Sequence, residues 1–413
     1  RPIVTVCHDF KGGYQSGEDL DPLGDFEHIS GRHYWLRYVE LVDEFIYFSH
    51  HMVTIPPTGW TNYLHRNGIP VLGTLIFEGS RNGYSDNEIF KKNEGGDFVY
   101  VKILTYLCQV FHFEGWLVNF ETRFDPKSEA AVEFVRSLTT SISMSINHGR
   151  VVWYDSYVPQ FNRVLYQNEI NELNWSFFTA ANRFMTNYWW DFDNLQHTLM
   201  NAGKLGIRNK VSFGIDVWGR GMKIGNGGLT SGIAVEYAKK FDGNVTLFAP
   251  AWTYEHFSLE QFFEIDDQFW LKIKKSIGAD PYEEQFDTTP WFVGRDNLSF
   301  LTFFSSGEGQ FFKVNGLEVS SRKWVQIGMA TPMPLKSELL DVDYTDSYIG
   351  GSSLKLSISQ FEPGVITLYK FQHYLEACLV DGYKLKARVC FKNLVRNVIP
   401  KLQLKCFIIR RGR

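Results

Sequence analysis

The sequence predicts an α/β protein in which a (β/α)8 barrel is followed by a C-terminal β-sandwich region. Three observations support this prediction. Short apolar segments recur along the first 255 residues, most of these segments end in polar residues, and the pattern changes to short strands separated by turns after residue 298. The chain has 413 residues, enough for a large barrel and an appended region.

Eight segments in the first part of the chain have the length of β-strands and are rich in β-branched or aromatic residues. Most are almost continuously apolar, as expected of strands that are covered on both faces. They recur at intervals of roughly 25–45 residues, which leaves room for one helix and two loops, the period of a βα unit. The segments are 3–9, 45–50, 70–78, 115–121, 151–156, 183–190, 211–218 and 245–252. Eight βα units predict a closed barrel of about 250 residues.

Helical segments are expected between these strands, at 86–92, 98–111, 128–143 and 232–240. The alternative fold is an open, doubly wound sheet. Such a sheet would require a nucleotide-binding glycine fingerprint after its first strand. The segment Lys11-Gly12-Gly13-Tyr14 is not such a fingerprint.

Three parts are predicted along the chain. The catalytic barrel spans 1–275. The stretch 276–297 is rich in Gly, Pro, Asp, Glu and Thr, which predicts a linker. The stretch 298–413 contains short strands between Gly and Ser turns, typical of a β-sandwich. Its end, 396–413, is basic and apolar without a clear pattern.

Charge and cysteine usage limit the functional classes. The net charge is −4, and no long basic run precedes the tail Arg410-Arg411-Gly412-Arg413, which argues against nucleic-acid or membrane-surface binding. No apolar run reaches about 18 residues, so no transmembrane helix is expected. The five cysteines are odd in number and widely spaced, and the first residues lack a signal peptide's apolar region. We therefore expect reduced thiols in a cytosolic protein.

Several groups of residues could hold a metal ion or a phosphate, but each lacks the full pattern. The aspartates at 341, 343 and 346 do not complete a calcium loop. The histidines at 50, 51 and 65 are not part of an H-E-x-x-H motif, and the glycine-rich segment 219–228 lacks the G-K-[ST] of a phosphate loop. We expect no metal and no cofactor.

The segment 115–121 carries the first candidate site. Strand alternation places Trp116, Val118 and Phe120 on one face and Leu117, Asn119 and Glu121 on the other. An amide and a carboxyl therefore share a face at the C-terminal end of a strand, where the catalytic residues of parallel barrels are found. Taken alone, the pair also fits a core amide followed by a solvated Glu.

Polar and aromatic residues at the other strand ends extend this pattern. Aromatic residues make up 16% of the chain, a proportion that suits either sugar stacking or a large aromatic core. Polar residues at predicted strand ends include His8, Asp9, Ser49, His50, His51, Glu78, Tyr154, Asp155, Ser156, Asn187, Asp216 and Glu255. Exposed Trp and Tyr side chains beside acids, amides and hydroxyls are the composition of a sugar-binding site.

These motifs together resemble glycoside hydrolase family 85, whose members cleave within the chitobiose core of N-glycans. The resemblance runs from Val6 to about Glu255 and continues more weakly to about residue 355. The matching stretches are Cys7-His8-Asp9 with Gly12-Gly13-Tyr14, 47–50 with 56–60, 71–78, 115–121, 153–156, 167–171, 187–190, 214–221 and 248–252.

The resemblance implies a retaining, substrate-assisted mechanism. In this mechanism the 2-acetamido oxygen of the cleaved GlcNAc attacks its own anomeric carbon and forms an oxazoline. By the resemblance, Glu121 is the general acid and then the general base, Asn119 holds the acetamide, and Tyr154 also bonds it. One protein acid suffices, which agrees with a single carboxyl on the 115–121 face.

Binding residues are also expected from this pattern, and one departure is visible. Tyr166 stands before Gln167-Asn168, where many members of the family carry Trp. The C-terminal region is also short for the family. Candidate sugar contacts are Glu78, Asn187, Trp189, Trp190, Trp218, Trp252, Asp216, His50 and Phe48.

The expected substrates are N-glycans, glycopeptides or free oligosaccharides. A non-catalytic lectin on a glycosidase barrel is the alternative, and the Asn119, Glu121 and Tyr154 set argues against it. A chitinase-like hydrolase would normally carry a D-x-x-D-x-D-x-E strand, which is absent from this sequence. The sequence predicts neither the glycan preference nor the oligomeric state.

Overall fold

The computed structural model describes residues 1–15, 18, 33–79, 86–124, 130–278, 291–293, 300–334, 339–357, 366, 368–372, 389, 390 and 392. The chain forms two compact units, Arg1–Gln372 and His373–Arg413. The first unit contains all the strands and helices named below.

The predicted barrel is confirmed. In the described part of the chain, eight parallel strands form a closed ring in chain order, with β11 pairing back onto β1. The strands are β1 (Val4–Asp9), β2 (Glu44–Phe48), β4 (Val71–Glu78), β5 (Gly115–Glu121), β6 (Arg150–Tyr154), β9 (Arg183–Met185), β10 (Val211–Asp216) and β11 (Asn244–Phe248). A short strand, β3 (Val53–Thr54), pairs antiparallel with β4, and β7 (Tyr157–Val158) forms a hairpin with β8 (Arg163–Val164).

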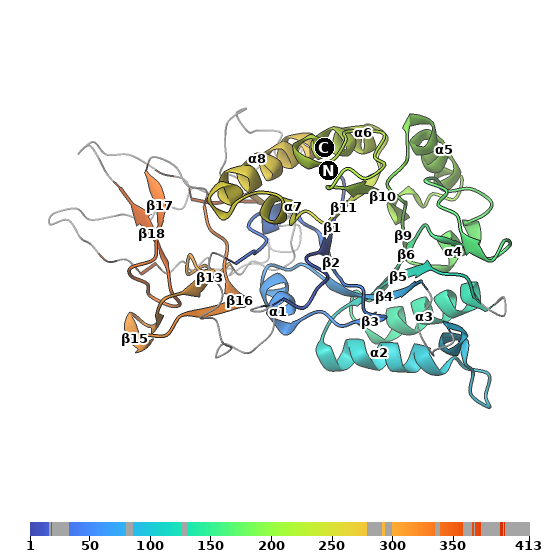
Figure 1. Ribbon diagram of the computed structural model, residues 1–413, viewed down its shortest axis with the longest axis horizontal. Helices are drawn as coiled ribbons and strands as arrows, with labels where there is room; N and C mark the ends of the chain where they lie inside the picture. The colour runs from blue at the N-terminus through green and yellow to red at the C-terminus, as the bar shows by residue number, and fades with distance from the viewer. Residues whose placement is uncertain are drawn as a thin grey trace, which may run out of the picture. The chain divides into compact units, whose positions relative to one another are not determined.

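Helices surround this ring of strands (Figure 1). They are α1 (Thr58–Arg66), α2 (Val99–Phe111), α3 (Ala131–Ser145), α4 (Trp175–Ala180), α5 (Phe192–Gly203), α6 (Ser231–Lys240), α7 (Trp252–Glu255) and α8 (Leu259–Ile277). The helices predicted at 98–111, 128–143 and 232–240 correspond to α2, α3 and α6, whereas the segment predicted at 86–92 forms the 3-10 helix η3 (Asp86–Phe90). None of the helices in the described residues has both the length and the hydropathy that a membrane span requires.

Local sequence explains several helix ends. At the start of α5, Asp191 accepts a hydrogen bond from the backbone of Asn194, and the Asn194 side chain bonds back to form a capping box. Ser258 and Gln261 make the same arrangement at the start of α8. The last turn of α8 ends at Gly278 in the left-handed region, where a residue without a Cβ is favoured.

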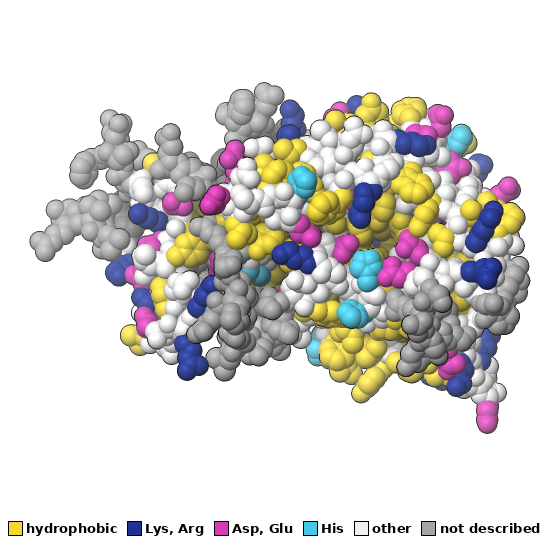
Figure 2. Space-filling model, in the orientation of Figure 1, with side chains coloured by type: hydrophobic (Ala, Val, Ile, Leu, Met, Phe, Trp, Pro, Cys, Tyr) yellow, Lys and Arg dark blue, Asp and Glu magenta, His cyan; other side chains and the backbone are white. Residues whose placement is uncertain are grey.

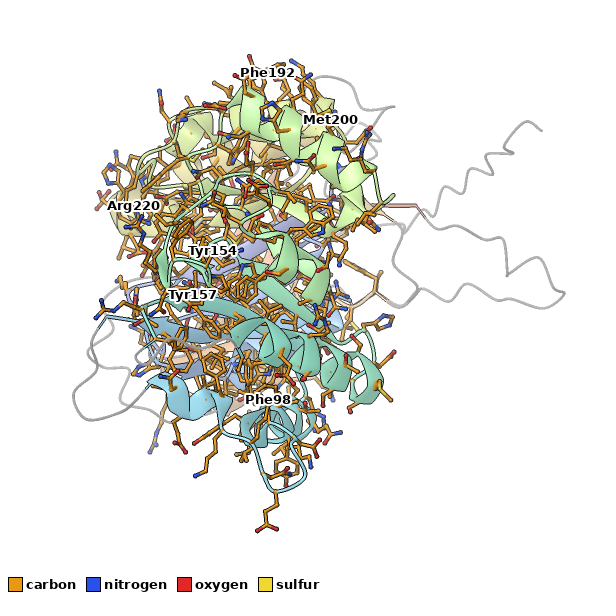
Figure 3. The ribbon with its side chains drawn as sticks, turned by 90° about the vertical axis from the view of Figure 1, so that its right-hand side faces the viewer. Phe98, Tyr154, Tyr157, Phe192, Met200 and Arg220 are labelled. Atoms are coloured by element: carbon orange, nitrogen blue, oxygen red, sulfur yellow. The ribbon has the colours of Figure 1, made fainter. Side chains whose placement is uncertain are left out.

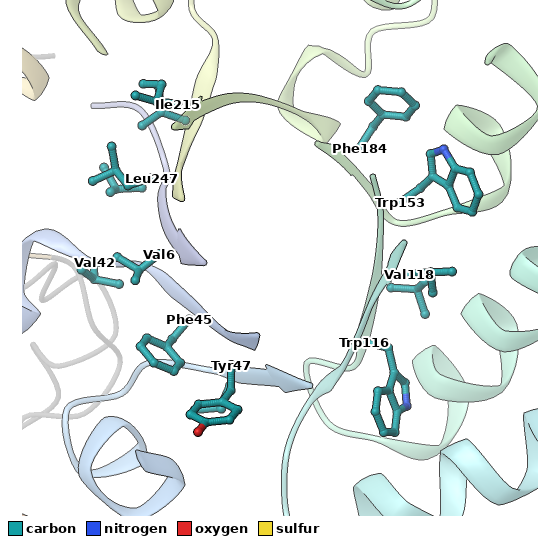
Figure 4. Packing of buried hydrophobic residues seen from close by; sticks show 14 of the residues in the cluster. Val6, Val42, Phe45, Tyr47, Trp116, Val118, Trp153, Phe184, Ile215 and Leu247 are labelled. Carbon is teal, nitrogen blue, oxygen red and sulfur yellow. The ribbon is translucent and has the colours of Figure 1, made fainter. Parts of the chain in front are cut away.

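The strands separate two apolar layers. On each strand, every second side chain points outward to the helices, as Val118 does on β5 and Trp153 on β6. These outward side chains belong to one large buried cluster (Figure 4). Each large side chain buried there contributes about 1.5–3 kcal/mol. The opposite faces fill the barrel interior with a smaller cluster that includes Leu72, Leu117 and Val152. The polar residues that follow on these interior faces are thereby directed toward the C-terminal mouth of the barrel.

The predicted β-sandwich after the barrel is not shown by the described residues. The described strands form two-stranded sheets, and a sandwich is not seen among them. The pairs are β12 (Trp291–Val293) with β19 (Lys370–Gln372), β13 (Ser306–Gly309) with β16 (Trp324–Ala330), β14 (Phe312–Val314) with β15 (Leu317–Ser320), and β17 (Leu340–Asp343) with β18 (Ser353–Leu356).

Strand β16 packs directly on the barrel. Arg66 of α1 donates hydrogen bonds to the carbonyl oxygens of Gly328 and Ala330, and Ile327 belongs to the same buried cluster as the barrel strands. Most of the predicted linker 276–297, and most of the chain after residue 372, lie outside the described residues. The three-part division of the chain therefore stays a prediction.

Candidate active site

The C-terminal end of β5 carries the two side chains at the centre of the candidate site. Leu117 belongs to the interior cluster, so alternation places Asn119 and Glu121 on the interior face as well, as predicted. Asn119 is 4% exposed and Glu121 is partly buried. A carboxyl and an amide therefore lie together at the barrel mouth.

The Glu121 carboxyl has two hydrogen-bonding neighbours. Its Oε1 accepts a hydrogen bond from the Tyr166 hydroxyl at 2.9 Å, and the Asn119 side chain also hydrogen-bonds it. By contrast, Oδ1 of Asn119 is buried without a hydrogen-bond partner among the described residues. An unsatisfied buried acceptor costs about 1–3 kcal/mol, so a donor on a bound molecule would stabilise this arrangement.

Burial raises the pKa of Glu121 above its ordinary value of 4.5, and the nearby Glu78 carboxylate raises it further. The hydrogen bonds from Tyr166 and Asn119 oppose this shift, as does the nearby His50. The net rise makes the protonated carboxyl more favourable than it is for an ordinary Glu. This is the property required of a general acid.

Glu78 and His50 lie beside the Glu121 carboxyl. The register of β4 and β5 sets Glu78 opposite Glu121, and His50 Nδ1 lies 2.8 Å from Glu78 Oε1. Phe48 is buried, with its ring edge-on to the imidazole of His50. Figure 2 shows acidic and histidine side chains next to each other near the centre of the face that it presents. In the described part of the chain, no three His, Cys, Asp or Glu side chains gather as metal ligands.

Tyr154, at the end of β6, starts a chain of hydrogen bonds. Its hydroxyl donates to Asn187 Oδ1 at 2.8 Å, and Asn187 Nδ2 donates to Asn168 Oδ1 at 2.8 Å. Asn168 Oδ1 also accepts from the backbone N–H of Trp189 at 3.1 Å. Three of the predicted site residues are thus connected through Asn168, which the sequence analysis did not assign to the site.

The buried Asp155 carboxyl holds the backbone of Gln167 and Asn168 in place. Its Oδ2 accepts from the backbone N–H groups of Gln167 at 2.9 Å and Asn168 at 2.6 Å, and its Oδ1 accepts from Asn174 Nδ2 at 3.1 Å. Burial raises the pKa of Asp155 to about 7, and these hydrogen bonds oppose the rise. The two backbone bonds fix Asn168 in the left-handed region, at φ 60°, where Asn is tolerated.

Two of the predicted tryptophans are exposed, and a third, Trp252, is partly buried. Trp189 is 42% exposed, and its ring meets Tyr166 edge-on at 5.4 Å. Trp218 is 39% exposed, and Trp252, the first residue of α7, stacks on His256 with ring centroids 5.4 Å apart. Exposed aromatic rings around a polar mouth can stack against the apolar faces of sugars.

Two predicted sugar contacts are buried and make hydrogen bonds within the protein. Trp190 is 1% exposed, lies in the cluster between strands and helices, and donates from Nε1 to the carbonyl of Gly214 at 2.7 Å. Asp216 is buried, and both its oxygens are engaged by the Arg220 guanidinium at 2.8 and 3.1 Å. Figure 3 shows Arg220 at the edge of the molecule and Tyr154 further inside. Asp216 therefore anchors the loop after β10, and the buried Trp190 is not available to a sugar.

The chain is similar to known proteins over most of its length. The sequence model described as Glycosyl hydrolase family 85 matches residues 19–312. The cytosolic endo-β-N-acetylglucosaminidase of Homo sapiens is 34% identical over 342 residues, which are 82% of this chain and 43% of that protein. Cytosolic endo-β-N-acetylglucosaminidase 2 of Arabidopsis thaliana is 33% identical over 338 residues, which are 81% of this chain and 45% of that protein. The chain thus spans less than half the length of these relatives.

One solved structure has a similar fold over most of the chain. The glycoside hydrolase domain of Endo-D from Streptococcus pneumoniae R6 superposes with a TM-score of 0.64 at 20% identity, covering 86% of this chain and 58% of that one. At this level of identity the likeness concerns the barrel fold alone.

Proposed function

We propose a function from one premise: the chain belongs to glycosyl hydrolase family 85. The protein is an endo-β-N-acetylglucosaminidase that hydrolyses the GlcNAc-β1,4-GlcNAc bond of the N-glycan chitobiose core. It acts with retention of configuration through an oxazoline, and no metal or cofactor takes part. The observation that carries this proposal is the placement of Asn119 and Glu121 on one interior face of β5, in contact with each other and beside Tyr154.

In the first step, the substrate supplies the nucleophile. The acetamide carbonyl oxygen of the cleaved GlcNAc bonds to its own anomeric carbon, and the glycosidic bond breaks toward the departing oxygen, which leaves the ring as an oxazolinium ion that keeps its N–H proton. Glu121 gives its proton to that oxygen, which is why a raised pKa matters. Because the nucleophile is already attached to the substrate, holding it in place replaces a bimolecular attack.

Asn119 and Tyr154 hold the acetamide in this step. Oδ1 of Asn119, which has no hydrogen-bond partner among the described residues, accepts the acetamide N–H and pushes electron density toward the attacking oxygen. Burial raises the pKa of the Tyr154 hydroxyl well above its usual range, so it stays protonated. Its single O–H donates to Asn187 Oδ1 in the structure, and we propose that it turns from Asn187 to the acetamide oxygen when the substrate binds. A neutral amide can serve here because the mechanism does not use a second carboxylate.

In the second step, Glu121 acts as a base. Its carboxylate takes a proton from water, whose oxygen bonds to the anomeric carbon while the bond to the acetamide oxygen breaks. One GlcNAc then remains on the acceptor side of the cleaved bond. Glu78, His50, Phe48, Asn187, Trp189, Trp218 and Trp252 are the proposed sugar contacts, and the cytosol is the proposed location because the relatives are named cytosolic.

The test is release of glycan from a high-mannose glycopeptide, followed by mass spectrometry. Glu121→Gln should lower kcat by at least about 10²-fold because the amide cannot give up a proton. The matched control is Glu114→Gln, the same change directly before β5, where the carboxyl accepts a hydrogen bond from the N–H of Val71. Near wild-type release by Glu121→Gln would refute the role of this residue. Glycan binding without release by the unmodified protein would instead indicate a lectin.

Asn119→Ala separates formation of the oxazoline from its use. This variant should fail to release glycan, because the acetamide is no longer held for attack. It should still consume a supplied sugar oxazoline, which already contains the ring that Asn119 helps to form. Unimpaired release of glycan by Asn119→Ala would contradict the proposed role.

A further inference from the structure

The Tyr166 hydroxyl touches the carboxyl that the proposed mechanism uses, and no role has yet been given to it. Its oxygen lies 2.9 Å from Glu121 Oε1. The ring is partly buried, meets Trp189 edge-on at 5.4 Å, and lies 6.1 Å from the ring of Tyr154. Tyr166 therefore lies between the Glu121 carboxyl and the rings of Trp189 and Tyr154.

The backbone on both sides of Tyr166 is anchored to the end of β6. The N–H of Leu165 donates to the carbonyl of Ser156 at 2.9 Å, and the N–H of Gln167 donates to Asp155 Oδ2 at 2.9 Å. Asp155 and Ser156 directly follow the last residue of β6. The barrel scaffold thereby sets the position of the Tyr166 hydroxyl, so its contact with Glu121 is built into the fold.

When Glu121 is ionised, Tyr166 must be the donor in their hydrogen bond, because a carboxylate has no proton to give. Burial and the charge of Glu121 raise the pKa of Tyr166, so the phenol remains protonated at neutral pH. A carboxylate accepts a stronger hydrogen bond than a neutral carboxyl, so this contact stabilises the ionised state of Glu121. While Glu121 is protonated, a donor at Oε1 favours the proton on Oε2.

We propose that Tyr166 is a positioning residue for proton transfer, in which its hydroxyl occupies Oε1 of Glu121 and leaves Oε2 to exchange the proton with the glycosidic oxygen and then with water. This inference rests on the proposed function and deepens it. In the first step Tyr166 directs the proton to the oxygen that faces the substrate. In the second step it stabilises the carboxylate that deprotonates water.

The test compares two pH profiles of the full chain and its Tyr166→Phe variant. The first is kcat/KM for glycan release, which falls at high pH as the free enzyme loses the Glu121 proton. The second is consumption of a supplied sugar oxazoline, which falls at low pH as Glu121 becomes protonated. Removing the hydroxyl should move both limbs to higher pH by about one unit, the size expected for one hydrogen bond to a charged group.

Tyr157→Phe is the matched control. Tyr157 is buried on the neighbouring strand β7, and its hydroxyl bonds Asn162 at 2.9 Å. Loss of the Tyr157 hydroxyl perturbs the β7–β8 hairpin that precedes Tyr166 but removes no contact with Glu121. The pH limbs of Tyr157→Phe should therefore stay at the wild-type positions. Circular dichroism confirms that each variant is folded.

The outcomes separate this inference from the proposed function. Unmoved limbs in Tyr166→Phe, or equal shifts in Tyr157→Phe, would overturn the role of Tyr166 while leaving the proposed function intact, provided that Glu121→Gln is inactive. An active Glu121→Gln variant would overturn both. A changed KM for glycopeptide without any shift of the limbs would assign Tyr166 to substrate binding and also refute the inference.

Discussion

Replacing Asp155 by Asn should lower kcat, although Asp155 is buried and acts only through the residues that it holds in place. Asp155 accepts hydrogen bonds from the backbone of Gln167 and Asn168 on one oxygen and from Asn174 on the other. An Asn can turn its oxygen toward the two backbone donors, but its NH2 group then faces the NH2 group of Asn174. One hydrogen bond to the Asp155 carboxyl is lost, and a donor is left unpaired.

Asn174 cannot turn to relieve this conflict. Its Nδ2 also donates to the carbonyl of Glu169 at 2.7 Å, and its Oδ1 accepts from the backbone of Asn171 at 3.0 Å. We therefore expect Asp155→Asn to lower the free energy of unfolding by about 2–3 kcal/mol. The amide oxygen of Asn accepts the backbone N–H of Asn168 more weakly than the Asp155 carboxyl does, so Asn168 is held less firmly against Asn187. Because Asn187 in turn bonds Tyr154, kcat should fall about 10- to 100-fold even where the protein is fully folded.

Urea unfolding measures the first effect, and glycan release at a temperature well below the transition measures the second. The control is Asp266→Asn, a change at another buried carboxylate, on α8, whose Oδ1 accepts from Thr253 at 2.9 Å. Asp266→Asn should lose stability and keep kcat. A folded Asp155→Asn protein with wild-type kcat would refute the connection between Asp155 and Tyr154, as would an equal loss of kcat in Asp266→Asn.

Two further predictions concern neighbours of the acid and the aromatic rim. The charge of Glu78 raises the pKa of Glu121, so Glu78→Gln should move the high-pH limb of kcat/KM to lower pH, opposite to the shift expected for Tyr166→Phe; a pH profile that moves upward would contradict this. Trp189→Ala should raise KM by about tenfold through loss of ring contact with the sugar while leaving stability within about 1 kcal/mol. Trp190→Ala should instead lower the free energy of unfolding by about 3–5 kcal/mol, because its indole is buried. Calorimetry and steady-state kinetics test both variants, and a large loss of stability in Trp189→Ala with a raised KM in Trp190→Ala would contradict the two assignments.

The strand residues of the site could be predicted from the sequence, because successive side chains along a strand point to opposite faces. The placement of Asn119 and Glu121 on the interior face of β5 follows directly from that rule, and Glu78 follows in the same way on β4. The rule fails where a strand is shorter than its apolar run. The segment predicted as a strand to 190 ends at Met185, so alternation could not tell the exposed Trp189 from the buried Trp190.

The loop contacts could not be predicted, since loops have no side-chain period. Tyr166 stands 45 residues after Glu121 and meets it only because a hairpin and two backbone anchors return the chain to the mouth. Asp216 has the position of a site residue at the end of β10, but Arg220 occupies both its oxygens. The polar side chain at a strand end was predictable in each case, whereas the partner that occupies it was not.

The short segment 165–168 connects both halves of the proposed chemistry. Tyr166 reaches the acid, and Asn168 reaches Tyr154 through Asn187, so one anchor at Asp155 positions the proton donor and the residue that holds the acetamide. This arrangement requires different signatures from the two substitutions. Tyr166→Phe should shift the pH limbs and preserve the hold on the acetamide. Asp155→Asn should shift the limbs and also slow oxazoline formation, because it weakens the hydrogen bonds that hold the backbone next to Tyr166 and at Asn168.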